Sequence, residues 1–144
     1  MALTIISGAA LGCETGFMVG AMSMLVSNMI FSQGVWTPWQ MFAMGITGFL
    51  AGLIFYGRRA GIKKVALCVF GGFCAVFIYG GIMNPASALM WMQEINAGVL
   101  LATYASGLPV DLVHAAATVL FLWFISEPMI EKIDRIRVKY GILR

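Results

Sequence analysis

The chain has 144 residues, of which 61% are hydrophobic and only 10% are charged, with a formal net charge of +3. A soluble domain carries roughly 25% charged residues and cannot bury so much apolar surface at this size. The composition therefore excludes an ordinary soluble domain and indicates an integral membrane protein. Strands with alternating polar and apolar residues are missing from the sequence, so we expect an all-α, polytopic membrane helix bundle, as one domain over residues 1–144.

The first apolar run, Ala2–Leu11, has half of the roughly 20 residues that a helix needs to cross a bilayer. It lacks the basic flank of a signal peptide, so it is predicted to be a partial span or a re-entrant piece. Glycines follow at positions 8, 12, 16 and 20. A continuous helix would gather them into one smooth packing face, but the polar turn after Gly12 leaves open whether they share it.

Four longer runs are predicted to be full transmembrane helices: Phe17–Phe31, Pro38–Gly57, Val65–Met83 and Leu108–Ser126. Pro38 suits the first turn of a helix, where its missing N–H costs nothing. Asn84-Pro85 is expected to end the third span, because the residue before a proline avoids the helical conformation. Cys13, Cys68 and Cys74 lack the spacing of a metal site and are expected to be small packing residues.

All nine cations lie in two clusters, at 58–64 and in the tail at 129–144. If the intervening segment Ala86–Gly107 crossed the membrane, the two clusters would lie on opposite faces. The positive-inside rule favours one face for both, so Ala86–Gly107 is predicted to be an outer-face helix or re-entrant segment. The tail is then cytoplasmic, either as an amphipathic helix along the membrane surface or as an ordinary helix end. Both clusters adjoin apolar spans, so nucleic-acid binding is not expected.

This topology collects polar and aromatic side chains at the outer face. The loop after Phe31 places Trp36 and Trp39 where tryptophan suits a membrane–water boundary, as an anchor or as the cap of a binding site. Asp111 and His114 stand three residues apart and share a helix face. Three interpretations are open for ionisable groups in such a span. The two side chains bond to each other and only orient helices, or Asp111 lies at the membrane interface, or the pair contacts a ligand or transfers protons.

The sequence contains few of the residue patterns that are typical of an enzyme or a metal site. The sequence has one histidine with no cysteine near it, which argues against a metal site. It contains no phosphate-binding glycine loop and no nucleophile elbow, so we predict no catalytic residue and no cofactor. If ATP drives this protein, a partner hydrolyses it.

The loop Ser32–Met41, SQGVWTPWQM, resembles the GQGPWTPWQM signature of a branch of the substrate-binding (S) components of energy-coupling-factor (ECF) transporters. The block Gly107–Ala115, GLPVDLVHA, also resembles that branch, as do Thr118, Phe121 and Lys139-Tyr140-Gly141. With Asn84-Pro85, the likeness covers nearly the whole chain.

The resemblance implies a membrane subunit, not an enzyme, that captures a vitamin or related micronutrient at the outer face of the cell membrane and delivers it inward. Its implied partners are a transmembrane coupling subunit and two cytoplasmic ATPases. The branch is associated with cobalamin-type compounds, although two tryptophans could stack on any flat heterocycle. The family has six spans, so the resemblance also predicts that the first helix and part of the second are absent here.

The expected ligand neighbours are Trp36, Gln40, Asn84, Asp111 and His114, with Asn28, Trp39 and Asn96 beside them. Two other interpretations remain open. In the first, the chain is a structural or assembly subunit without a ligand, and its polar groups only pack helices. In the second, it is a small membrane enzyme that uses Asp111 and His114 as an acid–base pair.

Overall fold

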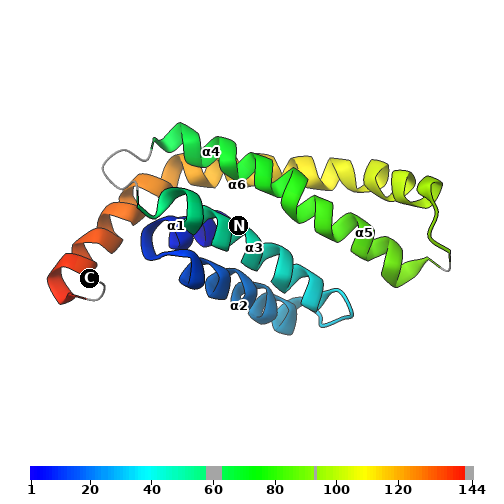
Figure 1. The fold of residues 1–144 in the computed structure, drawn as a ribbon, viewed down its shortest axis with the longest axis horizontal. Helices are drawn as coiled ribbons and strands as arrows, with labels where there is room; N and C mark the ends of the chain where they lie inside the picture. The colour runs from blue at the N-terminus through cyan, green and yellow to red at the C-terminus, as the bar shows by residue number, and fades with distance from the viewer. Residues whose placement is uncertain (58–62, 93, 142–144) are drawn as a thin grey trace.

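The computed structural model describes residues 1–57, 63–92 and 94–141. Their helices form an elongated bundle (Figure 1). The elements are α1 (Ala2–Leu11), α2 (Cys13–Phe31), α3 (Thr37–Phe55), α4 (Lys64–Phe73), the π-helix η2 (Cys74–Tyr79), α5 (Gly80–Trp91) and α6 (Ala97–Tyr140). Because α4, η2 and α5 follow one another directly, they make one helix of 28 residues. Together with α2, α3 and α6 it gives four helices, among the described residues, that are long and apolar enough to cross a membrane. The all-α membrane bundle is confirmed.

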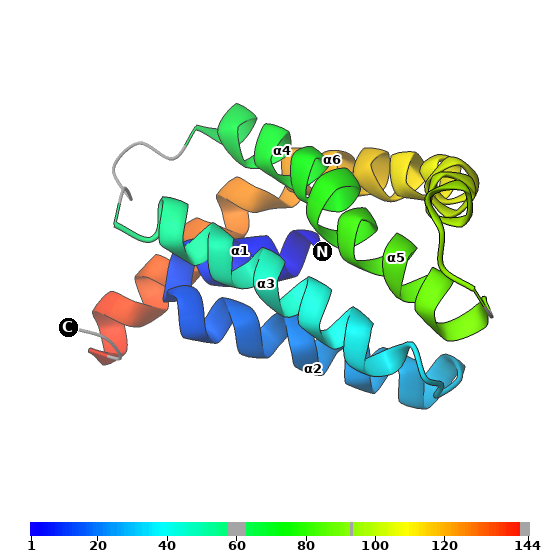
Figure 2. The ribbon, with the colours of Figure 1, turned by 45° about the vertical axis from the view of Figure 1, so that its right-hand side comes forward.

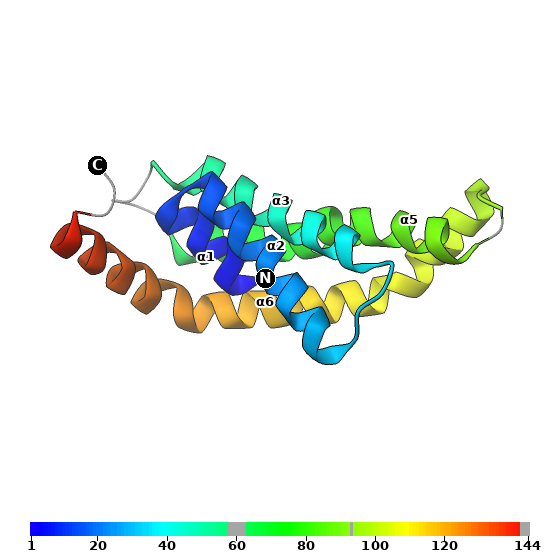
Figure 3. The same ribbon diagram turned by 90° about the horizontal axis from the view of Figure 1, so that it is seen from below.

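The short first helix is confirmed with the bounds that the sequence predicts. Figure 3 shows its N-terminal end at about the middle of the bundle, and α1 ends at Leu11, just before Gly12. The φ of Gly12 is 106°, a left-handed conformation that glycine adopts at little cost. The turn at Gly12 sends the chain back as α2, which begins at Cys13 and not at the predicted Phe17.

Glycines join α1 and α2 to α3. A Cβ atom built on Gly8 or on Gly16 would overlap the backbone carbonyl of Gly48, and one built on Gly20 would overlap the backbone of Met44. Helices approach this closely only where side chains are missing from the contact. The glycines at 8, 16 and 20 therefore do share a packing face, although they come from two helices.

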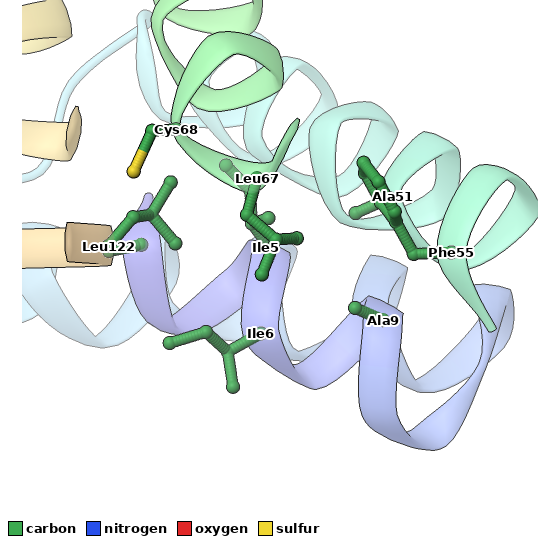
Figure 4. Close-up of a cluster of buried hydrophobic side chains, with 9 residues drawn as sticks. Ile5, Ile6, Ala9, Ala51, Phe55, Leu67, Cys68 and Leu122 are labelled. Carbon is green, nitrogen blue, oxygen red and sulfur yellow. The ribbon is translucent and has the colours of Figure 1, made fainter. Parts of the chain in front are cut away.

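The apolar core lies at the end of the bundle where α1 meets α2 (Figure 4). It is built from α1, α3, α4 and α6, and its labelled members are Ile5, Ile6, Ala9, Ala51, Phe55, Leu67, Cys68 and Leu122. Met129, Ile130 and Ile133 of α6 pack against this core. The first two turns of the predicted tail thus belong to the bundle, whereas Ile136 and Tyr140 further along are exposed.

Two predicted helix ends at prolines are wrong. The third span does not stop at Asn84-Pro85, because α5 continues through Pro85 to Trp91. The last span does not begin at Leu108, because α6 begins at Ala97 and contains Pro109 and Pro128. Prolines are tolerated in membrane helices, where neighbouring helices and local adjustments satisfy the freed backbone groups.

The predicted outer-face helix at Ala86–Gly107 is therefore wrong as well. Its first residues complete α5 and its last residues begin α6, with a turn between the two helices. The reasoning from charge nevertheless gave the right arrangement of the ends. The start of α4 and the C-terminal part of α6 lie at one end of the bundle, and the α5–α6 turn lies at the other (Figures 1 and 2).

At the basic end Lys64 Nζ lies 3.1 Å from Glu127 Oε2, so an ion pair joins the start of α4 to α6. Arg58, Arg59 and Arg144, which the charge argument also used, lie outside the described residues. The 44 residues of α6 make a helix about 66 Å long at about 1.5 Å per residue. Since the hydrocarbon core of a bilayer is only about 30 Å thick, α6 must extend beyond it.

Candidate substrate-binding site

The first polar group joins α2 to α3 at the end opposite the cations. Asn28 is buried, and its Nδ2 donates to Thr37 Oγ1 at 3.1 Å and to Gln40 Oε1 at 2.8 Å. Thr37 Oγ1 in turn donates to Gln33 Oε1 at 3.2 Å and accepts a hydrogen bond from the Gly34 amide at 3.4 Å. These bonds fasten the α2–α3 loop to the helices and bring together two of the predicted site residues, Asn28 and Gln40.

The second polar group joins α5 to α6. Asn84 Nδ2 donates to Asp111 Oδ2 at 2.9 Å, and each of these residues is only 8% exposed. Glycines make room for the pair, since a Cβ on Gly80 would overlap the Asp111 carboxylate and one on Gly107 would overlap the Asn84 amide. Asp111 is therefore held inside the bundle against α5. Its hydrogen bond within the described chain goes to Asn84 and not to His114.

Tyr79, which ends η2, links the two polar groups. Its ring meets the His114 imidazole edge to face, with the ring centroids 5.0 Å apart and an interplanar angle of 89°. Its hydroxyl lies near both the Gln40 side chain and the Asp111 carboxylate. Contacts thus run from Asn28 through Gln40 and Tyr79 to His114. We call these residues, together with Asn84 and Asp111, the polar cluster.

Trp36 and Trp91 close the same end of the bundle. Their ring centroids are 6.3 Å apart, with the planes tilted by 32°, so the α2–α3 loop is held against the end of α5. The other two predicted neighbours lie apart from this arrangement. Trp39 is 39% exposed, and Asn96 is exposed and caps α6 by accepting a hydrogen bond from the Val99 amide at 2.9 Å. No contact described in the structure joins Trp39 or Asn96 to the polar cluster.

A groove of about 360 Å³ lies one helical turn from the polar cluster along α2 and α3. Two of its residues lie one helical turn from the cluster: Met24 is four residues before Asn28, and Met44 is four residues after Gln40. The volume falls in the range of about 300–1,000 Å³ that is typical of small-molecule sites. The lining comes from α1, α2, α3 and α6, and consists of Met1, Ala2, Leu3, Thr4, Ser23, Met24, Met44, Phe121 and Ile125.

Three larger hollows, like the groove, are lined by no member of the polar cluster. One lies along the C-terminal part of α6, one lies on α4 and one lies between α2 and α3. Within the described residues, no group of three or more His, Cys, Asp and Glu side chains could hold a metal ion. The polar cluster offers hydrogen-bonding groups, and the groove offers apolar contact.

Sequence reasoning missed Thr37, Tyr79 and Trp91. Tyr79 carried a signal, since it is a hydroxyl-bearing residue in an otherwise apolar run. Trp91 carried another, because tryptophan after an apolar run is typical of the membrane boundary. Both lay in segments whose ends were placed incorrectly, so their position relative to the other site residues was hidden.

Comparison with known families gives a match over most of the chain. The family model described as "ECF-type riboflavin transporter, S component" matches residues 1–127, which include the whole polar cluster. No curated protein and no solved structure matches the chain. The family consists of transport proteins, so the interpretation of Asp111 and His114 as an enzyme's acid–base pair is wrong. Its description names riboflavin and gives no support to a cobalamin-type substrate. The chain belongs to the S components of ECF-type riboflavin transporters and is a substrate-binding membrane subunit of a vitamin transporter.

Proposed function

We propose that this chain binds riboflavin between the polar cluster and the adjoining groove, at the outer face of the cell membrane, and releases it inward. The observation that carries the proposal is the joining of six polar or aromatic side chains from α2, α3, η2, α5 and α6 next to a mostly apolar groove. The family match supplies the substrate class.

Riboflavin has a chemistry that suits both parts of this site. Its flat ring system has an apolar benzenoid end and an imide end with hydrogen-bond donors and acceptors, and its ribityl chain carries hydroxyls. The amides of Asn28, Gln40 and Asn84 and the carboxylate of Asp111 can exchange hydrogen bonds with the imide and the hydroxyls. The methionines and Phe121 of the groove offer apolar contact to the ring.

Energetics also favours a binding role for the polar cluster. Ionisable and amide groups are expensive inside a membrane helix and usually face a partner or a cavity. One hydrogen bond, such as that between Asn84 and Asp111, would suffice to orient α5 against α6. His114 of α6 and Tyr79 of η2 add polar atoms beside it, and α6 also lines the groove.

Orientation and partners follow from the charges and the family. The end of the bundle with Lys63, Lys64 and the cations of α6 is proposed to face the cytoplasm, by the positive-inside rule. A transmembrane coupling subunit and two ATPases are proposed to supply the energy, since the chain contains no phosphate-binding glycine loop. Co-purification of a tagged chain with those subunits tests this part by itself.

Titration of the detergent-purified chain with riboflavin, followed by quenching of flavin fluorescence, tests the binding proposal. We expect saturable one-to-one binding that thiamine does not compete away. Gln40→Leu should weaken binding about tenfold, the cost of about 1.4 kcal/mol in lost hydrogen bonding. Val113→Ala, at a 70% exposed position of α6 next to His114, is the matched control and should bind as the unmodified chain does. Equal affinity of the two variants would contradict the proposal.

A further inference from the structure

The spacing of buried residues along the α4–η2–α5 helix changes at the π-helix. One row of buried positions advances in steps of four up to Ala75, within η2, and again from Gly80, with a step of five between these two. In chain order this row is Leu67, Gly71, Ala75, Gly80, Asn84 and Ala88, and Cys68, Cys74 and Ala86 are buried beside it.

The helix that packs against this face keeps a regular spacing. In α6 the buried residues Asp111, Thr118 and Leu122 are separated by seven and then four residues, as expected for one side of an α-helix. Gly71 lies against Leu122 and Thr118, and Gly80 lies against Asp111. Both glycines therefore face α6, one near each half of the helix.

A regular α-helix could not place both glycines on that side. Nine residues separate Gly71 from Gly80, and at about 100° per residue they turn the helix by about 900°, which leaves the two positions on opposite sides. A π-helical turn closes with i→i+5 bonds and takes up one residue more than an α-helical turn. It therefore brings Gly80, and with it Asn84, back to the side that faces α6.

We propose that η2 is the positioning element of the substrate site: it absorbs one extra residue and thereby holds Asn84 against Asp111 while α4 stays packed on Leu122. The inference concerns the register of α5 on α6, which exists without a ligand, and so it goes beyond the proposed function. Removing one residue within η2 should convert it to an α-helical turn and keep both contacts. Adding one residue there cannot be absorbed in this way and should rotate Asn84 away from Asp111 by about 100°.

Phe77 is the residue to delete, because it is 66% exposed and its ring contacts that of Phe73 within the same helix. Phe77→Ala is the control for the lost side chain at unchanged length. Deletion of Ala116, an exposed residue of α6 between Asp111 and Leu122, is the matched deletion, because no π-helical turn there can give up a residue. Insertion of one alanine after Phe77 completes the set.

Register is read from a cross-link that needs no ligand. Cys13, Cys68 and Cys74 are replaced by alanine, Asn84→Cys and Asp111→Cys are introduced, and a short bifunctional thiol reagent is added to the detergent-purified protein. Intact-mass spectrometry distinguishes one reagent bridging both thiols from two separate additions. Riboflavin titration is carried out on the same length variants with Asn84 and Asp111 retained.

The Phe77 deletion should cross-link as fully as Phe77→Ala and bind riboflavin within about threefold of it, less than 1 kcal/mol. The Ala116 deletion and the alanine insertion should lose the cross-link. Loss of the cross-link in the Phe77 deletion, to the extent seen for the Ala116 deletion, would overturn the inference. If the pattern of cross-links is as expected but no variant, nor the unmodified chain, binds riboflavin, the register role of η2 stands and the proposed function fails.

Discussion

The bundle has two halves, α1–α3 and α4–α6, and the helices within each half are joined by different kinds of contact. In α1–α3, glycines let backbones touch, as at Gly16 and Gly48, and the Asn28–Gln40 hydrogen bond joins α2 to α3 at the end with the α2–α3 loop. In α4–α6, side chains make the connections: Lys64 pairs with Glu127, and Asn84 pairs with Asp111. Figure 2 shows the first half as the blue to cyan helices and the second as the green to red ones.

This difference shows where the fold leaves room for function. Contacts between glycine backbones have no side chain to offer a ligand and no space for one. Contacts between polar side chains can exchange a protein partner for a ligand group. The polar cluster lies where the halves meet, through Gln40 and Tyr79, so a ligand bound there would touch both.

The largest expected effect comes from adding volume to the glycine half. Gly48→Leu places side-chain atoms where the backbone carbonyl of Gly16 lies, and backbone atoms cannot turn aside as a side chain can. We expect a loss of about 3 kcal/mol in unfolding free energy, at the upper end of over-packing costs, or no folded monomer at all. Thermal unfolding in detergent measures it. Gly81→Ala, at a helical position with nothing within 4 Å of a new Cβ, should be neutral or slightly stabilising; equal loss in both would refute the role of the glycine contacts.

The next largest effect on stability is expected at the Asn84–Asp111 hydrogen bond, where removing one side chain should cost more than removing both. Asn84→Leu leaves the Asp111 carboxylate buried without its hydrogen bond, which should cost about 2–3 kcal/mol of stability. Asn84→Leu combined with Asp111→Leu removes both polar groups and should recover most of that loss. Riboflavin binding should stay lost in the double variant. If the double variant is as unstable as the sum of the single ones, the two side chains act independently and the pairing has no energetic role.

Trp36→Ala tests the contact that joins the two halves at the end with the polar cluster. Loss of the Trp36–Trp91 pair should cost about 1 kcal/mol of stability, the usual worth of an aromatic pair beyond its buried area. It should also weaken riboflavin binding, because the loop is no longer held over the site. A cycle with Trp91→Ala isolates the pair, and a coupling energy of zero would show that the two rings contribute separately.

The smallest effect is expected at the ion pair of the basic end. Glu127 is 62% exposed and Lys64 is 24% exposed at the side chain, so solvent screens the pair and it should contribute less than about 1 kcal/mol. Lys64 also lies over the Trp123 ring, 5.0 Å from its centroid. Lys64→Met should lower the Tm slightly, and the difference should shrink as salt is raised. A difference that does not change with salt would assign the effect to the stem of the lysine side chain.

Much of the fold could be predicted, because the bilayer limits the possible structures. Apolar runs long enough to span it gave α2 and α3 nearly in full, and the distribution of cations predicted that both basic clusters share one end. The helix ends failed at Pro85 and Pro109, since a rule derived from water-exposed chains does not hold where packed helices support a proline. The π-helix η2 has no sequence signal that hydrophobic periodicity detects, because all its residues are apolar or aromatic.

The sequence allowed candidate site residues to be named, but it did not show which of them contact one another. Residue type and outer position pointed to Asn28, Gln40, Asn84, Asp111 and His114. Which of them meet depends on helix rotation: Asn84 reaches Asp111 only because of the five-residue step across η2. Asn96 caps α6, as an asparagine just before a helix often does, and its role as a ligand neighbour stays a prediction.

Native mass spectrometry of the chain purified from cells grown with riboflavin tests the central claim most directly. The unmodified chain and the Val113→Ala variant should each carry the added mass of one riboflavin. The variant with both Asn84→Leu and Asp111→Leu should be folded and carry none. A folded double variant that retains riboflavin as fully as the unmodified chain would contradict binding at the polar cluster.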